Sequence, residues 1–147
     1  MHELSIAHSI IEVAKNHLVG FPNCEVRSIR LKIGALSCVH RDALHFSFDL
    51  IAADTPLQGA QLIIDDLPVV VFCPSCDALR ELPGIQRFVC PVCDTRTGDI
   101  RQGKELEIDS IEVVDQEDSH QRPSALEVGP EKNQCQRVSR HSKPSSI

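Results

Sequence analysis

Four of the seven cysteines form two closely spaced pairs, and these residues are well suited to bind a metal ion. Residues 73–93 read CPSCDALRELPGIQRFVCPVC, in which 13 residues separate the two C-x-x-C pairs. A tight turn after the first cysteine lets both thiolates of a pair reach one ion, and the second pair completes a tetrahedron. The predicted zinc ligands are Cys73, Cys76, Cys90 and Cys93.

This predicted site is structural, because four thiolates leave Zn(II) no open position for water or substrate. Folding of the segment then depends on the metal. Two disulfides are one alternative, but disulfides are rare in the cytoplasm, where this chain is expected. An iron site of the rubredoxin kind is another, although such sites usually lie in chains with more aromatic cover than five Phe, no Trp and no Tyr.

A second candidate site lies at the N-terminus, where the chain begins MHELS. The zinc-protease motif H-E-x-x-H is excluded, because the next histidine after His2 is His8, and this spacing places it on another helix face. A chelate built on the terminus remains: the amine of Met1, the amide nitrogen of residue 2 and the His2 imidazole are consecutive donors that close unstrained rings. Such nitrogen donors in a plane favour Ni(II) or Cu(II).

An open chelate of this kind is suited to handing an ion on. Its metal competes with a proton for the amine, whose ordinary pKa is about 8, so affinity for the metal should fall on acidification. These residues alone leave a second interpretation open. In that interpretation His2 is simply solvent-exposed, and Glu3 is an acid favourable at a helix N-terminus.

The surrounding sequence predicts an α/β (α+β) fold. Apolar residues at helical spacing predict a helix over about residues 3–19, ended by Gly20 and Pro22. The alternating segment EVRSIRLKIG predicts a half-buried strand. A second helix is expected from a cap at Ser37 to the break at Thr55 and Pro56. Its predicted buried stripe is Val39, Ala43, Phe46 and Leu50, with Leu44 and Ile51 adjacent.

The rest of the chain predicts further strands around the cysteine segment. AQLIIDDLPVVVF indicates a strand that is extended or kinked at Pro68, and two short antiparallel strands are expected around Pro83 and Gly84. KELEIDSIEVV resumes strand alternation with a phase slip that suggests a bulge, and should return to the first sheet. The predicted division is an α/β domain (1–70 and 104–114), a zinc-binding module (71–103) and a disordered tail (115–147).

Composition excludes several classes of function. The formal charge is -6, and residues 1–114 hold 16 acidic and 10 basic side chains, a balance that repels nucleic acid. No apolar run approaches the roughly 20 residues of a membrane span, and the start lacks the basic region of a secretory signal. A soluble cytoplasmic protein is expected, with no nucleic acid or membrane partner. The sequence contains no nucleophile at a recognisable spacing from a base, so we do not expect an enzyme.

Four segments together resemble the HypA/HybF family of hydrogenase maturation factors: MHELS, GALSCVHRDALHFSFDLIAADTPLQGAQLII, the CPSC and CPVC pairs, and ELEIDSIEV. The resemblance covers residues 1 to about 114. It implies a non-enzymatic nickel metallochaperone that helps insert Ni(II) into the large subunit of [NiFe] hydrogenase, working with the maturation GTPase HypB. It also implies a nickel domain of two helices and a three-stranded sheet, with a projecting zinc module.

The resemblance implies a role for particular residues. The nickel-binding histidine of the family matches His2, with Glu3 as the neighbouring acid, and its zinc ligands match the four paired cysteines. Some members carry a further histidine near the return from the zinc module, whereas this sequence reads TGDIRQGKE there. A zinc-ribbon interaction or transcription module, in which MHE is incidental, is the alternative. Its acidic charge disfavours DNA. A monomer or weak homodimer is expected.

Overall fold

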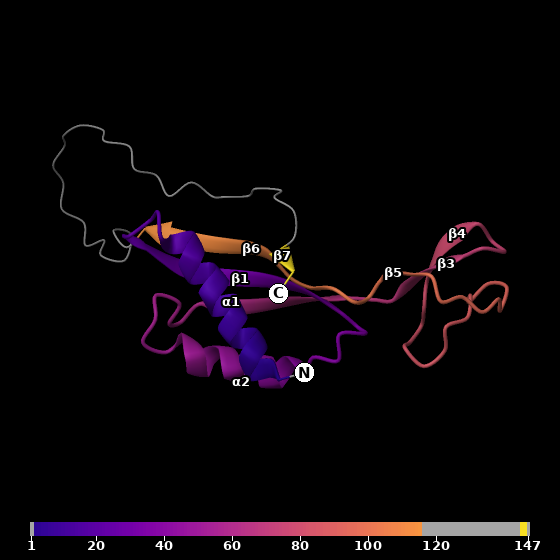
Figure 1. Cartoon of the computed structure of the whole chain (residues 1–147), viewed down its shortest axis with the longest axis horizontal. Coiled ribbons are helices and arrows are strands. Elements are labelled where there is room, and N and C mark those ends of the chain that lie inside the picture. Colours follow the sequence, from indigo (N-terminus) through magenta and orange to yellow (C-terminus); the bar gives the residue numbers. More distant parts are fainter. Residues whose placement is uncertain (1, 116–144, 147) are drawn as a thin grey trace, which may run out of the picture.

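Two helices and two separate sheets form the structure, a computed structural model that describes residues 2–115 and 145–146 (Figure 1). The elements are α1 (Glu3–Leu18), β1 (Cys24–Gly34), α2 (Arg41–Ala52), β2 (Gln61–Leu67), β3 (Val70–Cys73), β4 (Ala78–Glu81), β5 (Ile100–Gln102), β6 (Leu106–Asp115) and β7 (Ser145–Ser146). The predicted α+β class is confirmed, as are the first helix and the first strand.

The larger sheet has the strand order β2-β1-β6-β7, with the long strand β1 inside it. β1 runs parallel to β2, and α2 makes the connection between them. β1 is antiparallel to β6, so the strand that follows the cysteine segment does return to the first sheet. The register shifts where Arg30 pairs with Ser110 and Leu31 with Ile108, which leaves Asp109 as the predicted bulge.

The two faces of the larger sheet differ in chemistry. Ile29, Leu31 and Ile33 are fully buried in one core with the apolar sides of α1 and α2. Alternate residues of the same strand point the other way, and there Arg30 pairs with Asp65 at 2.9 Å and Lys32 pairs with Asp109. This alternation explains why the helices cover one face only and leave the other charged.

The predicted buried stripe of the second helix is wrong for Ala43, Phe46 and Leu50, although Val39 and Leu44 are buried as predicted. α2 begins at Arg41 and not at Ser37, and its buried residues are Leu44, Ser47, Phe48 and Ala52. Phe46 and Leu50 are 70% and 60% exposed, and Ala43 is exposed too. Both faces of this helix carry apolar residues, so periodicity could not decide which face points inward. Ser37 does not cap the helix, because its buried Oγ has no hydrogen-bond partner.

Pro68 divides the predicted long strand into β2 and β3, which belong to different sheets. The smaller sheet has the order β4-β3-β5 and projects from one end of the larger one (Figure 1). Its hydrophobic core is a small cluster of three buried side chains, Val69, Val71 and Leu82, flanked by Leu36, Phe88 and Ile100. We call residues 69–102, which hold this sheet and the four paired cysteines, the cysteine module.

The predicted strands on either side of Pro83 and Gly84 are also wrong. β4 ends at Glu81, and it pairs with β3, so that the first C-x-x-C pair forms the turn of the hairpin. Beyond Gly84 the only pairing in the described chain before β5 is the single bridge between Val89 and Arg96, on either side of the second C-x-x-C pair. Each cysteine pair therefore supplies its own chain reversal, and the Pro-Gly pair supplies none.

Close backbone packing joins the module to the larger sheet. A Cβ added at Gly34 would lie 2.1 Å from the carbonyl carbon of Gly103, and Gly103 itself has a φ of +121°. The N–H of Leu36 donates to Gly103 O at 2.7 Å, and the Leu36 side chain packs against the core of the module. The connection thus requires glycine at both positions.

No helix in residues 2–115 and 145–146 is long and apolar enough to cross a membrane. Of the predicted disordered tail, residues 116–144 and 147 lie outside the described residues. Ser145–Ser146 forms β7, which pairs with Ile108 and Glu107 of β6 and which the sequence did not predict.

Candidate metal centres

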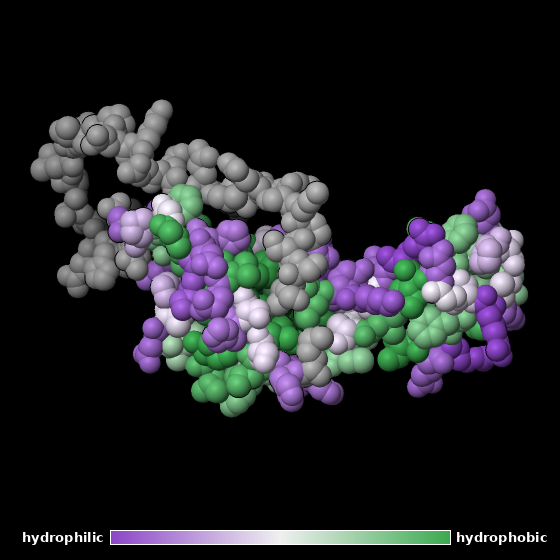
Figure 2. Space-filling model, viewed as in Figure 1, coloured by the Kyte–Doolittle hydropathy of each residue, from purple (hydrophilic) through white to green (hydrophobic). Residues whose placement is uncertain are grey.

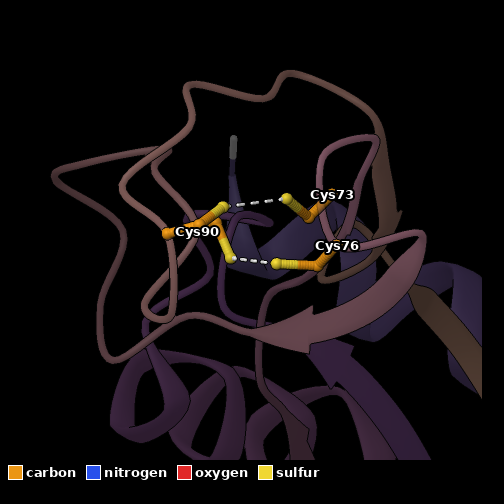
Figure 3. Close-up of side chains that lie close together, drawn as sticks. Cys73, Cys76 and Cys90 are labelled. Atoms are coloured by element: carbon orange, nitrogen blue, oxygen red, sulfur yellow. Dashed lines mark hydrogen bonds between the residues drawn. The ribbon is translucent and has the colours of Figure 1, made fainter.

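The four paired cysteines meet at one point of the module (Figure 3). Their sulfur atoms all lie within 4.8 Å of one another, with 3.5 Å between Cys73 and Cys93 and 3.8 Å between Cys76 and Cys90. A tetrahedral ion with Zn–S bonds of about 2.3 Å separates its sulfurs by about 3.8 Å. The cluster therefore fits a structural Zn(II) site, and all four cysteines predicted from the sequence contribute to it.

Two equivalent turns set up this cluster. Asp77 and Asp94 each follow the second cysteine of a pair, and both adopt left-handed backbone conformations with φ of 48° and 56°. Aspartate tolerates this region better than most residues. In the second turn the N–H of Asp94 donates to Cys90 O, and the N–H of Val92 lies 3.5 Å from Cys90 Sγ. The repeated C-P-x-C-D sequence is the signal that predicts this shared geometry.

The thiols of the cluster differ in acidity. Hydrogen bonding with the side chain of Thr95, and then with its backbone, lowers the pKa of Cys93 to about 6. The pKa of Cys76 is raised to about 12, first by its hydrogen bond to Cys93 and then by burial. Sulfurs this close cannot all be ionised without a cation between them. A divalent ion is what allows four thiolates to coexist here.

The N-terminal candidate has a different character. His2 is exposed and is the N-cap of α1, where its carbonyl accepts hydrogen bonds from the N–H groups of Ser5 and Ile6. The amide nitrogen of an N-cap residue precedes the helical hydrogen-bond ladder, so it is not committed to that ladder. Met1, whose amine completes the predicted chelate, lies outside the described residues.

Glu3 joins the start of α1 to the start of α2. Its Oε1 accepts a hydrogen bond of 3.1 Å from the backbone N–H of His40, the N-cap of α2. This bond, and one from the amide of Glu3 itself, lowers the pKa of the Glu3 carboxyl. Glu3 thereby fixes the helix end that bears His2. The residues that the structure describes contain no cluster of three or more potential ligand side chains apart from the four cysteines.

Sequence analysis missed two participants. Thr95 Oγ1 lies 3.2 Å from Cys93 Sγ and 2.9 Å from Ser75 Oγ, so it links the two cysteine pairs. Its place two residues after Cys93 is a usable local signal. His40 lies 37 residues from Glu3 in the chain, and no spacing rule could connect them.

Comparison with known proteins places this arrangement in a family. Residues 1–113 match the sequence profile described as "Hydrogenase/urease nickel incorporation, metallochaperone, hypA". The hydrogenase maturation factor HypA of Chloroflexus aurantiacus is 47% identical over 113 residues, which cover 77% of this chain and 99% of that protein. The corresponding protein of a Roseiflexus species is 42% identical over 115 residues, covering 78% and 94%.

A solved structure shares the fold. The solution structure of the Ni metallochaperone HypA from Helicobacter pylori superposes with a TM-score of 0.55 at 22% sequence identity, covering 78% of this chain and 99% of that chain. This similarity supports the fold alone, whereas the profile and the close relatives establish the family. The chain belongs to the HypA family of nickel-incorporation metallochaperones, a family of maturation factors and not of enzymes.

Proposed function

We propose that this chain binds Ni(II) at its N-terminus and delivers it to the large subunit precursor of a [NiFe] hydrogenase. The observation that carries the proposal is the exposed His2 at the start of α1, in a chain whose residues 1–113 match a family of nickel metallochaperones. The named relatives are hydrogenase maturation factors, which favours hydrogenase as the destination.

The proposed nickel ligands are consecutive nitrogen atoms. The amine of Met1, the amide nitrogen of residue 2 and the His2 imidazole form a chelate that no internal histidine could form, and such donors suit Ni(II). Glu3 supports the site by its hydrogen bond to His40, which holds the first turn of α1 against α2. Because the imidazole is exposed, a partner has access to the ion.

The second metal has a different proposed role. Cys73, Cys76, Cys90 and Cys93 hold Zn(II) permanently, since a closed tetrahedral set of thiolates leaves no position for exchange with a partner. Zinc stabilises the cysteine module, and nickel is the cargo. We propose the same division into a nickel-binding domain, a zinc module and a tail, with the zinc module at the bounds of the cysteine module (69–102) and the nickel-binding domain extending through β6 to Asp115.

The proposed partners are the maturation GTPase HypB and the hydrogenase large subunit precursor, in the cytoplasm. The net charge of -6 disfavours nucleic acid as a partner. We propose a monomer or weak homodimer, with no catalytic activity of its own. The alternative is a zinc-ribbon interaction module without nickel transfer. The fit of the four cysteines to Zn(II), considered alone, favours this alternative.

Nickel titration of untagged protein distinguishes these two functions. We expect His2→Ala to lose nickel binding while zinc content, measured in parallel by atomic absorption, stays the same. His8→Ala is the matched control, because His8 is also an exposed histidine of α1 but lies away from the terminus. Undiminished nickel binding by His2→Ala would reject the nickel-carrier function and favour the zinc-ribbon alternative.

Delivery needs a separate experiment. This chain, loaded with radioactive nickel, is mixed with nickel-free large subunit precursor and HypB. The precursor is then separated from this chain and its nickel is counted. We expect nickel to move to the precursor from the native chain but not from a His2→Ala preparation exposed to the same nickel. Equal transfer from both preparations would show that the N-terminal site is not the donor.

A further inference from the structure

α2 carries an apolar ridge on its outer face, made of Ala43, Phe46 and Leu50. The side chains of Phe46 and Leu50 are 70% and 60% exposed, and Ala43 is exposed beside them. The spacing of three and four residues places all three on one side of the helix. Figure 2 shows hydrophobic side chains gathered over α2 at the lower edge of the molecule.

The folded core does not need the side chains of this ridge. The opposite side of α2 already supplies Leu44, Phe48 and Ala52 to the core. A surface helix normally turns a polar face outward, whereas the outer side of α2 also carries the three apolar residues of the ridge. Two large adjacent apolar side chains held in water on a rigid helix indicate a surface that is covered in a complex.

The rim of the ridge is acidic. Asp42 and Asp49 lie seven residues apart, hence on the same side of α2 as Phe46. Neither carboxylate is in an ion pair or hydrogen bond with another residue of the described chain. Arg41 is the one Lys or Arg of α2, and its guanidinium is taken by Asp66 and by the carbonyl of Val39. The ridge therefore presents apolar surface beside uncompensated negative charge.

We propose that this ridge is a docking surface for a protein partner that presents a basic amphipathic helix. Lysine or arginine side chains beside the apolar face of that helix would meet Asp42 and Asp49, while its apolar face covers Phe46 and Leu50. Charge disfavours the other occupants. A second copy of this chain would bring aspartates against aspartates, and an anionic membrane would repel a chain of net charge -6.

The position of the ridge adds a consequence for nickel transfer. α2 begins beside Glu3, through the bond from the His40 N–H, so a partner seated along α2 lies next to the N-terminus. The surface would thus align a partner with the nickel site. This placement, though not the docking itself, rests on the proposed function.

Fluorescence anisotropy tests the docking without nickel. The probe is a labelled 18-residue leucine–lysine peptide that forms an amphipathic helix, added to the full zinc-loaded chain. We expect it to bind, and we expect Phe46→Ser with Leu50→Ser to weaken binding about tenfold. The matched control is Leu79→Ser with Ile85→Ser, two residues of the module that are 58% and 50% exposed, and it should leave affinity unchanged.

Charge is tested with a second pair of variants. Asp42→Asn with Asp49→Asn should weaken peptide binding about threefold at low salt, while Glu81→Gln with Glu107→Gln removes as much charge elsewhere and should have little effect. Circular dichroism and zinc content check that every variant is folded.

Several outcomes would overturn the proposal. The first is that the leucine–lysine peptide does not bind. The second is that the chain with Phe46→Ser and Leu50→Ser binds this peptide as tightly as the native chain does. The third is that a leucine–glutamate peptide binds the native chain as tightly as the leucine–lysine peptide does. A dimer in sedimentation that Phe46→Ser dissociates would assign the ridge to a second copy instead. Ridge-dependent binding to phosphatidylglycerol vesicles would assign it to a membrane. Because no nickel is present, failure here leaves the nickel-carrier function standing.

Discussion

The two sheets of this protein are stabilised by different interactions. The larger sheet and its helices bury 18 residues in one core, whereas the cysteine module buries only three in its own. At about 25 cal/mol for each Å² of apolar surface buried, three side chains cannot offset the entropy of ordering some thirty residues. Sulfur ligands and an ion must supply what the module lacks.

The two candidate metal centres differ in a parallel way. The cysteine cluster is closed, with four ligands brought together by the fold. The N-terminus has an exposed imidazole and no preformed cluster of ligand side chains among the described residues. A closed site retains its ion and an open one exchanges it, so one chain can use one metal for structure and another as cargo.

Removal of zinc should separate the two regions most clearly. Structural zinc contributes about 10–16 kcal/mol in small zinc modules, so a strong chelator, or Cys73→Ser, should unfold the cysteine module. The larger sheet should remain, because its core contains none of the ligands. Amide exchange resolved by residue measures both, with Cys38→Ser as control since Cys38 is exposed and outside the cluster. Retained zinc stoichiometry in Cys73→Ser would contradict the assignment.

Truncation of a core side chain should have the next largest effect. Phe48 is fully buried, so Phe48→Ala should lower the free energy of unfolding of the larger sheet by about 3–5 kcal/mol. Phe46→Ala is the matched control on the same helix, where 70% exposure predicts almost no change. Denaturant unfolding measures both, and a larger loss for Phe46 would show that α2 faces the other way.

The junction between the regions should be less sensitive but still specific. Gly34→Ala places a methyl group against the backbone of Gly103 and Lys104, so the strands must move apart at a cost of about 1–3 kcal/mol or more. Gly20→Ala is the control, because a Cβ there has no neighbour within 4 Å. Thermal unfolding monitored by circular dichroism compares them. Equal stability of both variants would mean that the junction is not packed as described.

The smallest expected effect is local to the N-terminus. Glu3→Ala removes the acceptor of the His40 N–H, so exchange of that amide should accelerate while global stability hardly changes. Glu12→Ala is the control, since the Glu12 carboxylate bonds only Lys15. Unchanged protection of the His40 amide in Glu3→Ala would show that the two helix starts are held together by other contacts.

The sequence predicted those features that have a local physical cause. The alternation of Ile29, Leu31 and Ile33 fixed β1, and the spacing of the cysteines fixed the metal cluster. Features that depend on tertiary contacts were not predicted from the sequence. The apolar residues on both faces of α2 hid which face is buried, and the hairpin turned at the cysteines because their left-handed aspartates reverse the chain earlier than Pro83 and Gly84. The Glu3–His40 bond spans two distant segments that only the fold brings together.

The central claim is that nickel is held by the terminus itself and not by an exposed histidine alone. Acetylation of the Met1 amine tests this directly, because it removes the amine as a donor while leaving the His2 imidazole and the zinc cluster in place. Nickel titration of the acetylated chain should show affinity at least about tenfold weaker than that of the native chain, with zinc content unchanged. Equal nickel affinity in the two chains would contradict the account.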